Sequence, residues 1–191
     1  FQCKQLVSTI SIFELLKIID KRIPSKIANA QRNLNYNGHL NVCFGWKSLK
    51  DKMPPLAIYN PSSKDKFHRI TCTNRLSEHA TPKDCYGAMI EMTISSKAEF
   101  SLDNPIINEA WEATRDLFSV TSKEPLYKYA HFSPFAYLVS KNKSMEAKSL
   151  ITSWLEKYGF ILAGRLGRFD YINMDVAYEH AIEAVKKIEN N

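Results

Sequence analysis

The residues best suited to chemistry lie in one stretch near the end of the chain. It reads Gly-Arg-Leu-Gly over Gly164–Gly167 and continues through Tyr171 to the triplet Asn173–Asp175. The two glycines allow a tight turn and a close approach of the backbone. Apolar residues then recur at spacings of three and four, which predicts a helix with Asn173 or Asp175 as its N-cap. A turn that leads into a helix N-terminus presents N–H groups that bind phosphates or an electron-rich ring carbonyl. On spacing alone, a surface loop before a capped helix is the more common interpretation.

The residues of this stretch resemble the C-terminal signature of a flavoprotein group that contains UDP-galactopyranose mutases and protoporphyrinogen-oxidase-like and amine-oxidase-like proteins. In that group Gly-Arg-Leu/Phe-Gly precedes two aromatic residues and an Asp/Asn-Met-Asp triplet, whose helix lies with its N-terminus against the flavin of FAD. The resemblance implies that Tyr171 helps to hold a substrate diphosphate, and Phe169 stands where the mutases usually keep a tyrosine. It also implies a set of cofactor-binding residues, namely Gly164, Arg165, Asn173, Met174 and Asp175.

Two looser resemblances to the same group lie earlier in the chain. The stretch Val7–Ser11 is similar to the segment that returns the chain from the substrate domain to the cofactor domain, with Ser11 where proline is commoner. The sequence Phe67-His68-Arg69 is similar to the middle of the group. Alternation over 67–73 predicts a strand with Arg69 on one face and His68 on the other, beside Ile70. Arg69 is a candidate substrate-binding residue in a cavity wall, and a solvated or salt-bridged arginine is an equal alternative.

The periodicity of the chain predicts the elements that position these residues. Ser11 and Glu14 form a capping box that begins a helix ending near Asp20, and Pro24 opens a second helix. Pro134 restricts an aromatic-rich run to an edge strand, a bulge or a break. Further strands are expected at 39–46, 56–59, 67–73, 86–94 and 160–163, and further helices at 105–118, 144–157 and after residue 173. These elements predict an α+β fold with a mainly antiparallel sheet flanked by helices, which the resemblance identifies with the substrate domain of such a flavoprotein.

The resemblance divides the chain into three segments. Residues 1–35 are the return segment with helices that adjoin a cofactor domain, 36–140 are the sheet-based substrate domain, and 141–191 hold the C-terminal helices with the flavin-facing Gly-Arg turn. No Gly-x-Gly-x-x-Gly follows a strand anywhere in the 191 residues, so the pyrophosphate-binding half of a dinucleotide fold is missing. We therefore expect FAD to be the cofactor of a longer, intact protein. We expect its N-terminal FAD-binding half to be the main partner of this chain, and the chain alone to be inactive and to retain no FAD.

Composition excludes several other classes of protein. Hydrophobic residues make up 45% of the chain and the net charge is +6, which is typical of a globular domain. The basic residues form no stripe interleaved with aromatic residues, so a nucleic acid is not expected as partner. No apolar run is long enough to span a membrane. The isolated cysteines indicate reduced thiols in a reducing, cytoplasmic compartment; they are Cys3, Cys43, Cys72 and Cys85.

Motifs for other catalytic chemistry are absent from the sequence. The five histidines show no His-Glu-x-x-His or paired-ligand spacing, so no metal site is expected. A Gly-x-Ser-x-Gly nucleophile elbow is also missing, which argues against a hydrolase.

Two hypotheses from different classes remain. The first is part of an FAD-dependent oxidoreductase or mutase acting on a small-molecule substrate, with a nucleotide sugar as the sharper version. The second is a stand-alone ligand- or protein-binding module without catalytic activity, which uses its open sheet face. A second copy of the chain is a further candidate partner, because self-association would cover an exposed apolar patch.

Overall fold

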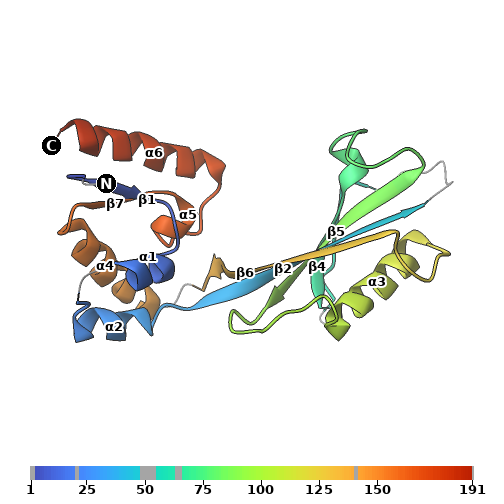
Figure 1. Ribbon diagram of the computed structural model, residues 1–191, viewed down its shortest axis with the longest axis horizontal. Coiled ribbons are helices and arrows are strands. Elements are labelled where there is room, and N and C mark those ends of the chain that lie inside the picture. Colours follow the sequence, from blue (N-terminus) through green and yellow to red (C-terminus); the bar gives the residue numbers. More distant parts are fainter. Residues whose placement is uncertain (1–2, 20–21, 48–54, 63–65, 140–141, 191) are drawn as a thin grey trace. The chain divides into compact units, whose positions relative to one another are not determined.

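The computed structural model describes residues 3–19, 22–47, 55–62, 66–139 and 142–190 (Figure 1). The chain forms two compact units. Unit 1 comprises residues 1–36 together with 137–191, and unit 2 comprises residues 37–136. The segment boundary expected at residues 140 and 141, and the helix end expected at Asp20, lie outside the described residues. The two ends of the chain thus fold together in unit 1, which contains the Gly-Arg turn.

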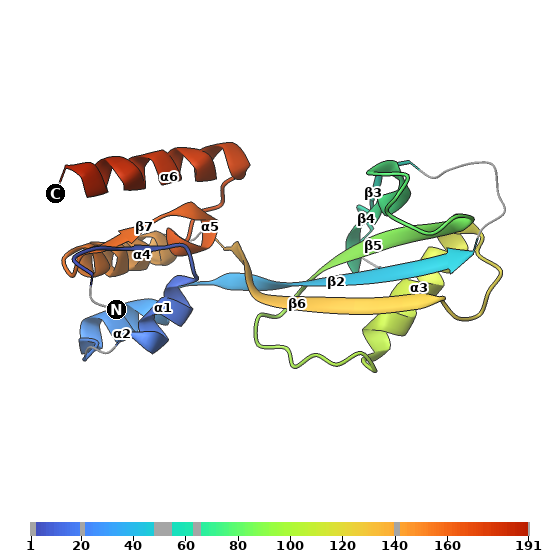
Figure 2. The same cartoon turned by 45° about the horizontal axis from the view of Figure 1, so that its top comes forward.

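A five-stranded antiparallel sheet forms unit 2 and confirms the predicted α+β class (Figure 2). Its order is β3-β4-β5-β2-β6, and β4 pairs antiparallel with β3 and β5. Pro134 lies on β6, an edge strand, which is one of the three outcomes that the sequence allowed. The strands are β2 (Tyr36–Lys47), β3 (Ala57–Tyr59), β4 (Phe67–Cys72), β5 (Cys85–Ile94) and β6 (Tyr127–Leu138), with a 3-10 turn η1 (Thr73–Arg75) after β4.

Helix α3 (Pro105–Phe118) packs on one face of this sheet. Asn104 caps it by accepting a hydrogen bond from the N–H of Ile106, and its start at Pro105 agrees with the helix predicted at 105–118. Trp111 packs on Phe44 of β2, with ring centroids 5.1 Å apart. Alternate residues of β2 and β5 are buried against α3, so the other face of the sheet receives the polar residues between them.

Unit 1 surrounds a two-stranded parallel sheet with helices. β1 (Leu6–Ser8) pairs with β7 (Phe160–Leu162), and Ser8 lies opposite Leu162. The Ser11 hydroxyl accepts from the N–H of Phe13, which confirms the predicted cap of α1. The helices are α1 (Ile12–Ile18), α2 (Ser25–Gln31), α4 (Asn142–Glu156), α5 (Gly164–Gly167) and α6 (Met174–Glu189). In the part of the chain that the structure describes, no helix is both long and apolar enough to cross a lipid bilayer.

Candidate functional site

The two glycines of the Gly-Arg turn meet two different backbone needs. Gly164 has φ +72°, in the left-handed region that favours glycine. A Cβ on Gly167 would lie 2.5 Å from the carbonyl oxygen of Ser8 on β1, so no larger residue fits without movement of the backbone. The predicted tight turn is therefore at the first glycine, and the predicted close approach is at the second. Together they form the short helix α5 directly after β7.

Arg165 lies against two tyrosine rings. Its guanidinium carbon is 4.8 Å from the ring centroid of Tyr137 and 4.7 Å from that of Tyr171, both within cation–π range. Its Nη1 donates to the carbonyl of Ile172 at 3.3 Å. The structure thus brings Arg165 and Tyr171 together and adds Tyr137 at the end of β6. Tyr137 belongs to the aromatic-rich run around Pro134, and no spacing rule in the sequence links it to residue 165.

Helix α6 begins at Met174 with Asn173 in the N-cap position. The backbone of Asn173 is extended, and its carbonyl accepts from the N–H of Ala177 at 3.1 Å. The Asn173 side chain makes no capping hydrogen bond. Asp175 lies inside the first turn, so the expectation that its carboxylate caps the helix is wrong: the non-helical backbone that a cap requires is at Asn173. Met174, the first helical residue, is 88% exposed.

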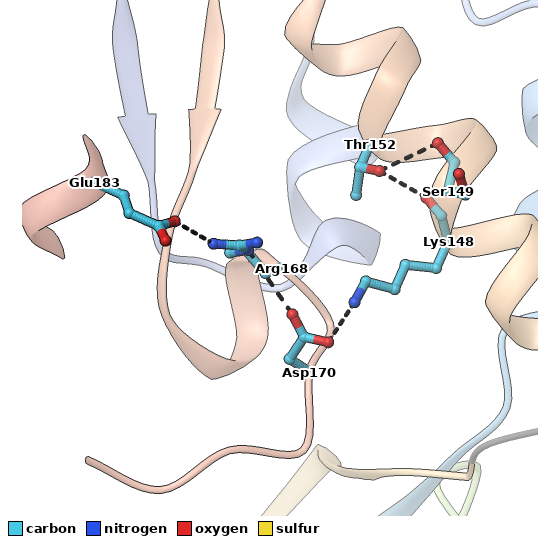
Figure 3. A network of polar contacts seen from close by, with 6 residues as sticks. All are labelled: Lys148, Ser149, Thr152, Arg168, Asp170 and Glu183. Atoms are coloured by element: carbon cyan, nitrogen blue, oxygen red, sulfur yellow. Dashed lines mark hydrogen bonds and ion pairs between the residues drawn. The ribbon is translucent and has the colours of Figure 1, made fainter. Parts of the chain in front are cut away.

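A polar network ties the segment between α5 and α6 to its neighbours (Figure 3). Asp170 accepts a hydrogen bond from Lys148 of α4, and Arg168 Nε lies 3.8 Å from Asp170 Oδ2. Arg168 also donates through Nη1 to Glu183 of α6 at 2.8 Å. The network therefore fixes the approach to α6 from both sides.

Phe169 has its ring in the interior of unit 1. It is 6% exposed and meets the Phe13 ring edge-on at 5.7 Å. The position at which the resemblance expects a tyrosine is therefore occupied here by a buried ring without a hydroxyl group.

A second group of polar residues lies on the sheet of unit 2, on the face opposite α3. Arg69 Nε and Nη2 each lie 2.5 Å from one oxygen of Glu91, in a bidentate ion pair between β4 and β5. Tyr59 of β3 stands beside the guanidinium, with its ring centroid 6.0 Å away. These partners raise the pKa of Arg69 above its usual value, chiefly through the hydrogen bonds to Glu91. The salt-bridged alternative for Arg69 is thus observed. Neither of two cavities in unit 2, of about 240 and 440 Å³, has Arg69 in its wall.

Two histidines join Glu91 on this face. His39 Nε2 of β2 lies 3.5 Å from Glu91 Oε2, and ligand atoms of His39, His68 and Glu91 all lie within 4.8 Å of one another. The alternation of β4 predicted His68 on the opposite face, beside Ile70. That prediction is wrong because the β4–β5 register shifts between Phe67 and Arg69, which turns His68 toward Glu91. The sequence holds no signal for this cluster, since its residues come from three strands.

Comparisons with known proteins identify the fold. Neither a protein-family model nor a curated protein matches the sequence. The structure of a reduced UDP-galactopyranose mutase is similar, with TM-score 0.73 and 16% identity, over 87% of this chain and 36% of that one. A protein of Exiguobacterium sp. 255-15 assigned as a protoporphyrinogen oxidase matches with TM-score 0.59 and 11% identity, over 85% of this chain and 36% of that one. The PF1083 protein of Pyrococcus furiosus matches with TM-score 0.52 and 11% identity, over 69% of this chain and 31% of that one. The chain therefore has the fold of about a third of these larger proteins.

Proposed function

We propose that this chain is the substrate-side and C-terminal part of an FAD-dependent oxidoreductase or sugar-nucleotide mutase. The observation that carries the proposal is the grouping of Arg165, Tyr171 and the N-terminus of α6 around one turn of unit 1. The resemblance assigns these positions to the flavin and to a diphosphate. Their contacts in the structure suit those roles.

The first turn of α6 suits the anionic edge of a flavin. A helix N-terminus has about half a positive charge, and no Asn173 side-chain oxygen covers it. The backbone N–H groups that begin at Met174 would donate to the pyrimidine end of the ring, where negative charge develops on reduction. FAD would supply the redox chemistry, and Gly164, with φ +72°, would set the direction of the turn beside it.

Arg165 and Tyr171 suit a phosphate group. The rings of Tyr137 and Tyr171 lie within 4.8 Å of the guanidinium carbon and restrict its motion, so less entropy is lost when an anion binds. A guanidinium donates in its own plane and matches the oxygens of a diphosphate in a forked geometry. A nucleotide sugar would supply that diphosphate.

In unit 2, the Arg69–Glu91 pair is the candidate for substrate contacts.

An exposed apolar stripe on α6 indicates where the FAD-binding half would dock. Five large residues at helical spacing face solvent, while His180 and Ala184 of the same helix are buried. An apolar stripe of this kind is typical of a covered helix. The stripe comprises Met174 (88% exposed), Tyr178 (70%), Ile182 (41%), Val185 (53%) and Ile188 (45%).

The parallel strands β1 and β7 also favour docking of an FAD-binding half. Parallel sheets occur almost only where helices cover both faces, and two strands alone are not independently stable. Leu6 and Val7 of β1 are 43% and 42% exposed. The first two solved structures above are nearly three times as long as the part that this chain matches. A partner with parallel strands and apolar helices, as in an FAD-binding half, fits both surfaces.

The four free cysteines suit the cytoplasmic location that we propose.

Light scattering on the isolated chain distinguishes this proposal from a stand-alone module. With the α6 stripe uncovered, we expect the chain to self-associate as its concentration rises. Replacing Ile182 and Val185 by lysine should reduce that association while circular dichroism remains unchanged. The matched control replaces the exposed Glu179 and Lys186 of the same helix by alanine. A wild-type chain that stays a monodisperse monomer at all concentrations would support the stand-alone module instead.

A further inference from the structure

We propose that His39, His68 and Glu91 form a binding site for a divalent transition-metal ion such as Zn²⁺, on the face of the unit 2 sheet opposite α3. The site lies in unit 2, apart from the residues of unit 1 proposed for the flavin, and it shares Glu91 with the pair proposed for substrate contacts. Two imidazoles and one carboxylate are a ligand set that Zn²⁺ takes in proteins, with the fourth position open to water or to a bound molecule. The spacing of the histidines along the sequence predicts no metal site, and only the sheet brings the three residues together.

The distances suit an ion shared by these side chains. Ligands that bind a tetrahedral ion at 2.0–2.1 Å lie about 3.4 Å apart. His39 Nε2 and Glu91 Oε2 are 3.5 Å apart, so these two atoms already stand at the required separation. The ligand atom of His68 lies within 4.8 Å of both, and the side chain is half-buried, so a small rotation of its ring completes the set.

The sheet holds the three ligands on adjacent strands. Glu91 is on β5, which lies between β4 with His68 and β2 with His39. The irregularity in β4 brings His68 to the face of Glu91, against the alternation of its strand. β-bulges that re-aim a side chain are over-represented beside functional sites. The bulge is an observation independent of the ligand distances, and it favours a site over a chance cluster.

Arg69 shapes the affinity of the site. Glu91 is 1% exposed, and a buried carboxylate needs a cation, which Arg69 supplies in the metal-free protein. A carboxylate has about four lone-pair directions, so Glu91 can keep Arg69 and also bind an ion through Oε2. The guanidinium would then orient the carboxylate as an outer-shell partner. Its positive charge also lowers the affinity for a second cation, so removal of Arg69 should strengthen metal binding.

The test is a titration of the chain with Co²⁺, followed by its visible absorption, and with Zn²⁺ in competition. We expect saturable binding of one ion and displacement of Co²⁺ by Zn²⁺. His68→Ala should weaken binding by at least about tenfold, since even outer-shell partners contribute 10–100-fold. The matched controls His79→Ala and His131→Ala remove exposed histidines and should leave the affinity unchanged. Absence of a Co²⁺ spectrum, or equal binding by wild type and His68→Ala, would overturn the proposal.

A second variant tests the site through stability. Arg69→Met leaves Glu91 buried without its cation and should lower the midpoint of urea unfolding. Zn²⁺ should raise that midpoint more in Arg69→Met than in the wild type, because the ion supplies the missing positive charge. A midpoint that Zn²⁺ leaves unchanged in Arg69→Met would also overturn the proposal. Neither outcome bears on flavin binding, which concerns unit 1.

Discussion

At the scale of single residues, the geometry of unit 1 depends on two positions that favour glycine for different reasons. Gly164 adopts a left-handed conformation with open space around it, whereas Gly167 lies against the Ser8 carbonyl. Arg165 stands between them and takes its orientation from the tyrosines that it contacts. The direction of one guanidinium is thus set by two backbone constraints and two rings.

Replacing each glycine by alanine should separate the cost of the left-handed backbone at Gly164 from that of the close approach at Gly167. Gly164→Ala should cost about 1–2 kcal/mol of unfolding free energy, the strain of a left-handed alanine. Gly167→Ala should cost more, because its Cβ would stand 2.5 Å from a backbone oxygen and must push β1 away from α5. Urea unfolding of both variants measures the difference. A larger loss for Gly164→Ala would contradict the close approach that the structure shows.

The cysteines should differ in reactivity according to burial. Desolvation raises the pKa of the Cys43 and Cys72 thiols, so at a given pH each forms less thiolate than an ordinary cysteine. Cys3 is exposed, and we expect iodoacetamide to modify it first and the buried Cys72 last. Raising the pH should speed the Cys72 reaction over a range that extends above that of an ordinary thiol. Mass spectrometry of timed samples checks the order, and modification of Cys72 before Cys3 would contradict it.

At the scale of elements, the approach to α6 is held by charges from three parts of unit 1. Lys148, Asp170, Arg168 and Glu183 form a chain of ion pairs from α4 to α6. An isolated surface pair stabilises a protein very little, but a network in which Lys148 and Asp170 are less than a quarter exposed contributes more.

Asp170→Asn should therefore destabilise the chain by about 1 kcal/mol. It removes the charge that faces both Lys148 and Arg168 while keeping the size of the side chain. The matched control is Glu156→Gln, which breaks the exposed ion pair with Lys187 and should cost less than about 0.5 kcal/mol. Chemical denaturation measures both changes. Equal losses in the two variants would show that Asp170 is an ordinary surface residue.

Local signals in the sequence predicted most elements but not the contacts between them. The alternating apolar residues of β2 and the Asn104-Pro105 start of α3 depend on near neighbours, so both were predicted correctly. The register shift in β4 depends on its pairing with β5, and simple alternation therefore misplaced His68. The contacts Arg165–Tyr137 and His39–Glu91 join residues far apart in the chain, and a single sequence gives no signal for such pairs.

At the scale of the whole molecule, the central claim is that unit 1 receives a flavin held by a second half of the protein. The α6 stripe and the open β1–β7 pair are the surfaces that such a half would cover. The N-terminus of α6 is where the proposal is most specific, because the backbone N–H groups that begin at Met174 are expected to meet the cofactor.

The most direct measurement compares Met174→Pro with Met174→Ala in the longer protein that contains the FAD-binding half. Position 174 is the first helical residue and Asn173 before it is extended, so proline is tolerated there and removes only one N–H donor. Alanine keeps that donor and serves as the matched control. We expect Met174→Pro to weaken FAD binding about tenfold to a hundredfold, as for loss of a hydrogen bond to a charged group, with Met174→Ala close to wild type. Equal FAD affinity and flavin content in both variants, with unchanged circular dichroism, would contradict the claim that this helix end contacts the flavin.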